Sequence, residues 1–125
     1  MNLVKSVMRE IENKSKEFYE FVLPPVDIHA TEDSLKVVID IPGFAKKDID
    51  LTLYGSILSI KARKADEAGD GDLLCNQRPG IIDKKIRLPA YIKRGEEEIS
   101  SAKLEDGVLT LIIPLTKRGK SIPLD

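Results

Sequence analysis

A single histidine and a single cysteine are the side chains of this sequence best suited to catalysis or metal binding. His29 falls with Asp27 and Thr31 on the polar face of a predicted strand, so we expect it to be exposed. Cys75 lies in a glycine-rich loop with no plausible base beside it, which favours a packing or incidental role. A metal site needs several ligands and a nucleophile needs a base. The sequence therefore predicts no enzyme activity, no cofactor and no metal or catalytic site.

Apolar residues near the carboxyl end indicate binding instead. Ile122 and Leu124 flank Pro123, and a basic hinge at 117–120 precedes them in the tail, 117–125. Residues two apart in an extended backbone point the same way, so the two aliphatic side chains suit two adjacent pockets of a groove. The same residues also suit a final strand that closes the chain's own sheet. The pattern alone leaves both interpretations open.

Composition limits the class of protein. The 125 residues carry a net charge of -1, from 20 basic and 21 acidic residues, which argues against nucleic acid as the main partner. No apolar run approaches the ~18 residues that span a membrane, and the early charges are unlike a signal peptide. We therefore expect a soluble cytoplasmic protein. Charged residues make up 33% of the chain while Asn and Gln are scarce, a bias that resembles proteins of thermophiles.

Residues 1–23 are predicted to form an amphipathic helical arm, because apolar side chains recur there at helical spacing until two prolines end the helix. Three roles remain open for this arm. It packs on its own domain, associates with other subunits or with exposed apolar surface of other proteins, or lies on a membrane surface, against which its glutamates argue. The apolar stripe consists of Val4, Met8, Ile11, Phe18 and Val22.

Residues 24–116 show an apolar period of 2, which predicts β-strands. The clearest hairpin signal is Asp106-Gly107, since both central positions of a type I′ turn need positive φ. Short antiparallel strands at this spacing predict an all-β, immunoglobulin-like sandwich of about seven or eight strands. The apolar runs fall at 35–41, 49–53, 58–62, 82–88 and 109–115.

The loop 64–80 interrupts this rhythm. Its glycines and charged residues surround a small apolar kernel formed by Leu73, Leu74 and Cys75. The kernel is either part of a solvated loop or a short strand that pairs with the sheet edge of another molecule. The residues alone leave both open.

Four segments together resemble the small heat shock proteins of the Hsp20/α-crystallin family. The stretch IPGFAKKDI at 41–49 looks like the family's PGF-x-K-x-D-I segment. The stretch AKLEDGVL, from Ala102 with Gly107 in its turn, is similar to the A-x-x-x-n-G-V-L signature. Arg87-Leu88-Pro89 resembles the Leu-Pro after the central strand, and Ile122-Pro123-Leu124 the I-x-I tail, with Leu in the third place. The short arm, loop and tail look most like an archaeal member.

The resemblance implies an α-crystallin domain with a short helical amino-terminal arm and an extended carboxyl-terminal tail. It implies an ATP-independent chaperone, or holdase, that keeps unfolding client proteins from aggregating under heat stress and passes them to ATP-dependent chaperones. It also implies a large dynamic homo-oligomer, built from dimers and often octahedral.

The resemblance also implies roles for specific residues. The segment 72–78, with Leu73, Leu74, Cys75 and Arg78, becomes a strand that inserts into the partner's sheet to form the dimer. The tail then docks in a groove of a neighbouring dimer, and the arm serves clients and assembly. The predicted groove residues are Ile49, Leu51, Leu53, Leu104, Val108 and Leu109.

A different class with the same sandwich is a p23-like co-chaperone adaptor, which works largely as a monomer on another chaperone. That class lacks an I-x-I tail and usually ends in an acidic segment. Mass in solution separates the two.

Overall fold

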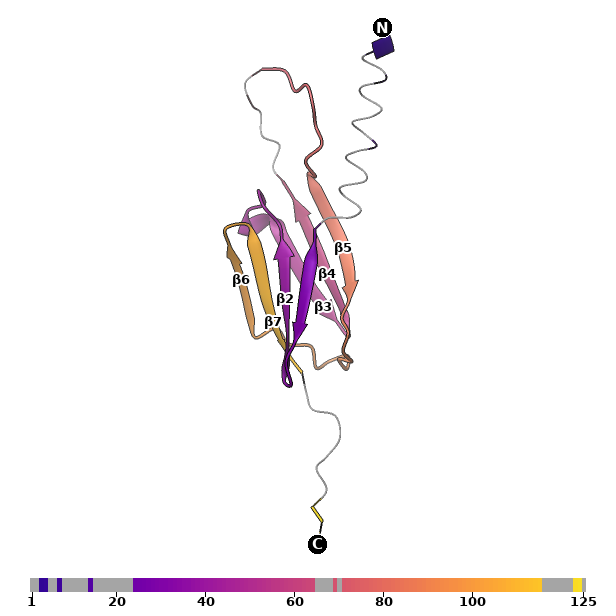
Figure 1. Ribbon diagram of the computed structural model, residues 1–125, viewed down its shortest axis with the longest axis vertical. Helices are drawn as coiled ribbons and strands as arrows, with labels where there is room; N and C mark the ends of the chain where they lie inside the picture. The colour runs from indigo at the N-terminus through magenta and orange to yellow at the C-terminus, as the bar shows by residue number, and fades with distance from the viewer. Residues whose placement is uncertain are drawn as a thin grey trace.

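The computed structural model describes residues 3, 4, 7, 14, 24–64, 69, 71–115 and 123–124. Two antiparallel sheets pack face to face, one with the strand order β1-β2-β7-β6 and the other β3-β4-β5 (Figure 1). A short 3-10 turn, η1 (Lys46–Asp48), leads into the second sheet. The strands are β1 (Val26–Ala30), β2 (Ser34–Asp40), β3 (Ile49–Tyr54), β4 (Ile57–Arg63), β5 (Ile81–Arg87), β6 (Ser101–Glu105) and β7 (Val108–Pro114).

The predicted all-β sandwich is confirmed, with seven strands in the described part of the chain. Period-2 alternation is strict in the two central strands of the first sheet, β2 and β7, and in β4 of the second, where every second side chain is buried. The register of β2 and β7 places Val37 opposite Leu111 and Ile39 opposite Leu109, so the buried side chains of both strands share one face. The second sheet covers this face with Leu58 of β4 and its neighbours on the same face, Ile60 and Ala62.

The turn between β6 and β7 has the geometry that the sequence predicted. Asp106 has φ 51° and Gly107 φ 75°, the two positive values that a type I′ turn requires. The Ile41 N–H donates to the Gly107 carbonyl over 2.7 Å, and a Cβ on Gly107 would come within 3.0 Å of Pro42. Gly107 is therefore required both by its own backbone conformation and by the close approach of the segment after β2.

The core of the described residues contains apolar side chains only, with no buried polar or charged group. Shape and apolar area therefore hold the core together. No helix among the described residues is long and apolar enough to cross a membrane.

Different segments of the chain lie at the two ends of the sandwich (Figure 1). Pro24 at the start of the first sheet and the ends of the 64–80 loop lie at one end, where the Lys64 N–H donates to the Gly80 carbonyl. The chain leaves the first sheet at the opposite end, where the Leu115 N–H donates to the Asp33 carbonyl. The turn between β3 and β4 lies at that second end as well.

Truncating the core at Leu111 tests this packing. Leu111 is 0% exposed, so Leu111→Ala should lower the free energy of unfolding by about 2–5 kcal/mol through lost burial and a residual cavity. The matched control is Ile112→Ala, whose half-exposed side chain points to the opposite face and should cost less than about 1.5 kcal/mol. Chemical denaturation measures both, and equal losses would contradict the assigned faces.

Candidate functional site

Two edge strands carry half-buried aliphatic side chains on their inward faces. β3 is the edge of the three-stranded sheet and β6 the edge of the four-stranded sheet. Figure 1 shows η1 and the start of β3 behind the β6–β7 turn, so both edges lie on one side of the sandwich. Because each strand has a neighbour on one side only, its inward side chains pack on the core without being fully covered. These side chains are Ile49, Leu51, Leu53 and Leu104.

The other two predicted groove residues lie elsewhere. Val108 alternates with the buried side chains of β7 and therefore lies on the outer face of its sheet, paired with Glu105 and Asp40. Leu109 points inward but is only 4% exposed, and it forms part of the core behind Leu104, its partner in the register. Of the predicted set, only the β3 members and Leu104 share this half-buried side, and the docking groove itself stays a prediction. Assigning both neighbours in one strand to one groove overlooked that adjacent residues face opposite ways.

Ala102 lies on the same face of β6 as Leu104, opposite Leu111. Ala102 is exposed on this edge strand. A methyl group at this point leaves the space beside Leu104 open to an incoming side chain. The β6–β7 hairpin thus places Ala102, the half-buried Leu104 and the Gly107 turn along one edge of the four-stranded sheet.

The loop kernel is fully accessible. Leu73 is 75% exposed and Leu74 85% exposed, and the described residues from 71 to 80 contain no strand. Cys75 is an exposed free thiol, which excludes packing in the core of its own chain. Arg78 lies exposed near the base of the loop. Two adjacent leucines exposed to this degree are what a segment would show before it pairs with another molecule, but the strand exchange itself stays a prediction.

Most of the arm and the tail lie outside the described residues. Val4 is exposed, whereas Met8, Ile11, Phe18 and Val22 are not described. In the tail Ile122 is not described, and Leu124 is 94% exposed after Pro123. Leu124 is therefore not part of a closing strand in its own sheet.

On the opposite side of the sandwich, a lysine side chain of β5 bonds to the segment that leads into the first sheet. Lys84 lies between Ile82 and Ile86 on the inward face of β5, and its Nζ donates to the Pro24 carbonyl over 3.0 Å. This bond ties the edge of one sheet to the start of the other, at the point where the arm begins. A lysine that points inward from an edge strand also discourages further strands from pairing there.

Sequence reasoning missed a polar brace at the end of the sandwich where β3 turns into β4. The carboxylate of Glu97 accepts hydrogen bonds from the Gly55 N–H, over 2.9 Å, and from the Gly95 N–H. Ser56 Oγ donates to the Ala90 carbonyl over 2.7 Å and accepts from the Ile92 N–H over 3.0 Å. The bond from Gly55 to Glu97 and the two bonds of Ser56 join residues 34 to 42 positions apart, so no local pattern predicts them.

The brace changes the acidity of Glu97. Hydrogen bonds from the backbone N–H of Gly55 first, and then from its own N–H, lower the pKa of Glu97 below its ordinary 4.5, and nearby Arg94 adds to this. Charged acceptors make stronger bonds than neutral ones, so the ionised carboxylate holds the turn in place.

These surfaces suit binding, and the described residues offer little for catalysis. His29 is exposed on β1, as predicted, and no group of three metal-ligating side chains occurs among the described residues. The half-buried leucines of β3 and β6 and the exposed leucines of the loop can instead accept apolar segments of other chains.

Comparisons with known proteins agree with this geometry. The model of the Hsp20/alpha crystallin family matches residues 27–124. The small heat shock protein C2 of Rickettsia felis is 29% identical over 117 residues, covering 84% of this chain and 74% of its own. The chloroplastic small heat shock protein of Pisum sativum is 30% identical over 98 residues, but this chain spans only 41% of its length.

A solved structure shows the same fold. A mutant of hsp14.1 from Sulfolobus solfatataricus P2 has a TM-score of 0.71 and 38% sequence identity, covering 99% of this chain and 98% of that one. The relatives come from bacteria, plants and an archaeon, so the comparisons extend well beyond archaea.

The brace should make stability depend on pH. The contribution of Glu97 is fully present above pH 4.5 and is lost as the pH falls through its lowered folded-state pKa. Glu97→Gln should therefore lower the melting temperature at pH 7 but not at a pH where the wild-type carboxyl is protonated. Thermal unfolding at both pH values measures the difference, with exposed Glu98→Gln as control. An equal loss at both pH values would argue against a charge-dependent brace.

Proposed function

Because the chain belongs to the Hsp20/alpha crystallin family, we propose that it is an ATP-independent holdase that works in the cytoplasm as a large dynamic homo-oligomer. A chaperone role follows from the family itself. The proposal adds that the chain needs no ATP, that it assembles into a homo-oligomer and that it captures unfolding clients. ATP-dependent chaperones can later receive these clients.

The observation that carries the proposal is the pair of half-buried aliphatic edges, β3 and β6, on one side of the sandwich. A fully covered core would leave nothing for another chain to bind. Here Leu51, Leu53 and Leu104 retain accessible apolar surface at strands that have no further strand beside them among the described residues. An extended apolar segment can cover these side chains and bond to an edge backbone at the same time.

The tail supplies such a segment in our proposal. Full burial of Ile122 and Leu124 contributes about 1.5–3 kcal/mol each. Ordering the hinge and tail costs about 1–2 kcal/mol per residue, and Pro123 reduces this cost because its φ is already restricted. Because the cost of ordering the tail offsets the gain from burial, a single tail binds only weakly. Many tails in a closed shell act together through effective concentration, so the shell is stable while each contact opens readily.

The dimer forms, in this proposal, through the exposed kernel of the loop. Leu73 and Leu74 would lie along an edge of the partner's four-stranded sheet, where β1 is the outermost strand in the described part of the chain. Arg78 would stay at the base of the exchanged segment. The amphipathic arm completes the proposal as the surface for clients and for contacts inside the shell.

Suppression of aggregation tests the holdase function directly. A client protein such as citrate synthase, heated with the full-length chain in the absence of ATP, should show reduced light scattering. Apolar capture needs no nucleotide, so adding ATP should leave the suppression unchanged. Full client aggregation at a tenfold excess of this protein would contradict the proposal.

Removing the two tail anchors should dismantle the shell. The double variant Ile122→Ala, Leu124→Ala loses the side chains that fill the groove, so size exclusion with light scattering should show dimers in place of the large assembly. Ser121→Ala is the matched control at a polar tail position and should leave the assembly intact. A large assembly of the double variant would refute docking by the tail, and a monomeric wild type would favour the co-chaperone class.

Removing the loop leucines should weaken the dimer itself. In the background of the tail variant, Leu73→Ser with Leu74→Ser removes about 3 kcal/mol or more of apolar burial, so the dimer dissociation constant should rise at least about a hundredfold. Sedimentation measures this constant. Cys75→Ser, also exposed, is the control and should have little effect. An unchanged constant for the leucine variant would exclude strand exchange through this kernel.

A further inference from the structure

A second surface lies at the end of the sandwich opposite the loop. The β3–β4 turn and the segment that follows β5 enclose an open hollow of about 690 Å³. Residues 54–57 line it from the turn, and residues 87–88 and 90–94 line it from the other segment. We call this surface the tyrosine platform. It shares no residue with the aliphatic set of β3 and β6, although Tyr54 is the last residue of β3.

The platform is held rigidly. Glu97 clamps Gly55 from one side, and Ser56 bonds to Ala90 and Ile92 from the other. The Leu88 N–H also donates to the Ser56 carbonyl over 2.8 Å. A surface that is already ordered loses little conformational entropy on binding, so even a small contact area can capture a ligand.

Aromatic and apolar side chains form its face. Tyr54 is 57% exposed and Tyr91 is 66% exposed, and these are two of the three tyrosines of the chain. The guanidinium of Arg94 lies 4.7 Å from the centroid of the Tyr54 ring. Below them Leu88 and Ile92 are buried and provide an apolar floor. Exposed tyrosines beside an arginine are typical of binding surfaces, because large flat side chains give contact area at little entropic cost.

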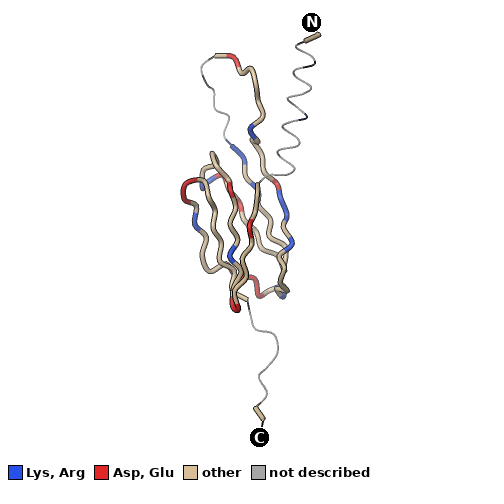
Figure 2. The backbone as a smooth tube through the Cα atoms, in the orientation of Figure 1, with Lys and Arg blue, Asp and Glu red and all other residues tan. Residues whose placement is uncertain are grey.

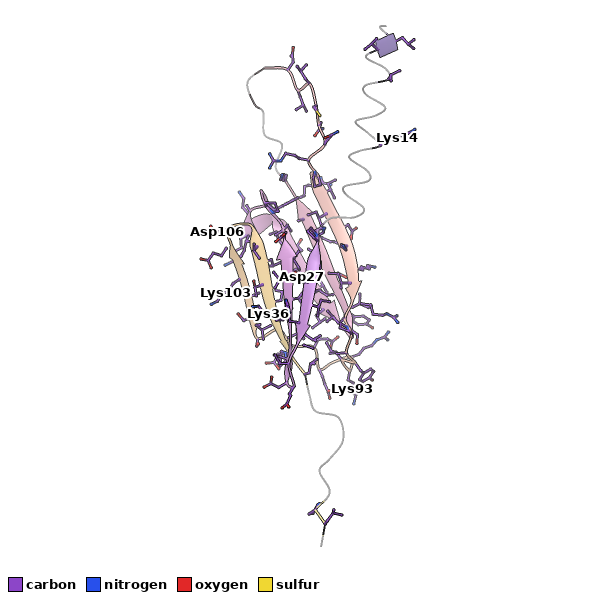
Figure 3. All side chains as sticks on the ribbon, in the orientation of Figure 1. Lys14, Asp27, Lys36, Lys93, Lys103 and Asp106 are labelled. Carbon is purple, nitrogen blue, oxygen red and sulfur yellow. The ribbon has the colours of Figure 1, made fainter. Side chains whose placement is uncertain are left out.

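The charges of the platform select among ligands. Arg87, Lys93 and Arg94 line the hollow, and its described lining includes no Asp or Glu. Figure 3 shows Lys93 at this end, away from Lys36 and Lys103 on the four-stranded sheet. The acidic run 96–98 follows at once in the chain, with the Glu97 carboxylate turned to backbone N–H groups. One carboxylate can therefore be matched by the cations, whereas a polyanion would also meet the acidic run.

From this combination we infer that the tyrosine platform binds an extended client segment in which an aromatic or aliphatic residue is followed by a single carboxylate. The apolar residue lies on Tyr54, Tyr91 and the floor beneath them, and the carboxylate faces Lys93 and Arg94. The inference rests on the proposed holdase function and adds to it a site with a charge preference. Single-stranded nucleic acid would also stack on tyrosines, but its phosphates would be repelled by the acidic run.

Peptide binding to the full-length chain tests the inference. Since the protein contains no tryptophan, the fluorescence of a peptide tryptophan reports binding directly. The probe is acetyl-Gly-Leu-Trp-Asp-Leu-Gly-amide, and the matched probe carries Asn in place of Asp. We expect the Asp peptide to bind about five- to tenfold more tightly, and 0.5 M salt to remove most of that preference.

Variants then locate the site. Lys93→Glu should abolish the preference for the Asp peptide, and Tyr91→Ser should weaken both peptides about tenfold. Lys36→Glu makes the same charge change on β2 and should alter neither. Equal binding of the two peptides, or loss of the preference in Lys36→Glu but not in Lys93→Glu, would overturn the inference. Displacement of the Asp peptide by oligo-dT would overturn it in favour of nucleic acid.

The two proposals fail in different ways. If the chain suppresses no client aggregation but retains the peptide preference, the holdase proposal fails and the platform stands as a peptide site. If it suppresses aggregation while Lys93→Glu leaves peptide binding unchanged, the platform inference fails alone. Melting temperature and oligomer size of both variants should match the wild type, which separates lost binding from lost folding.

Discussion

The packing of two aliphatic sheet faces against each other is the interaction on which the rest of this structure depends. Each sheet can bury only one face, and the described core contains no polar group that would tie the sheets by a specific bond. Apolar area therefore holds the core together, and the hydrogen bond from Lys84 to Pro24 joins the sheets only at the periphery. Two open sheets stacked in this way necessarily have four edge strands, here β1, β6, β3 and β5, and an edge strand has unpaired backbone groups.

The four edges are treated differently, and this difference organises the surface. Figure 2 shows charged residues along β5, which carries Asp83, Lys84, Lys85 and Arg87. Charges on an edge and an inward lysine oppose the addition of another strand. β3 and β6 instead keep aliphatic side chains half covered, so association there removes further apolar surface from water. Partly covered apolar side chains lie on β1 as well, at Val26 and Ile28, so accessible apolar surface is not confined to β3 and β6.

Polar interactions act at the ends of the sandwich, where apolar packing stops. Lys84 bonds to Pro24 at one end, and Glu97 and Ser56 brace the β3–β4 turn at the other. These hydrogen bonds bury little apolar surface, but they fix the positions of Pro24 and of the β3–β4 turn. In the assembly proposed above, individual contacts of a few kcal/mol would open without an energy source.

Much of the fold could be predicted because its signals are local. Alternation at period 2 in residues 35–41 and 109–115 depends only on the geometry of an extended chain, and the Asp106-Gly107 turn only on which residues tolerate positive φ. The same alternation places Val108 and Leu109 on opposite faces of β7, and the predicted groove did not take this into account. The strand-exchange and tail roles came from resemblance, and they remain proposals.

The sequence by itself therefore determined the strands, the hairpin and the family, since each follows from neighbouring residues or a short motif. Only the tertiary structure decided which strands are edges, that Leu104 stays half covered while Leu109 is enclosed, and that Glu97 reaches Gly55. The physical reason is that exposure at an edge depends on what the other sheet covers. A hydrogen bond between residues 42 positions apart likewise depends on how the whole chain packs, which no local pattern encodes.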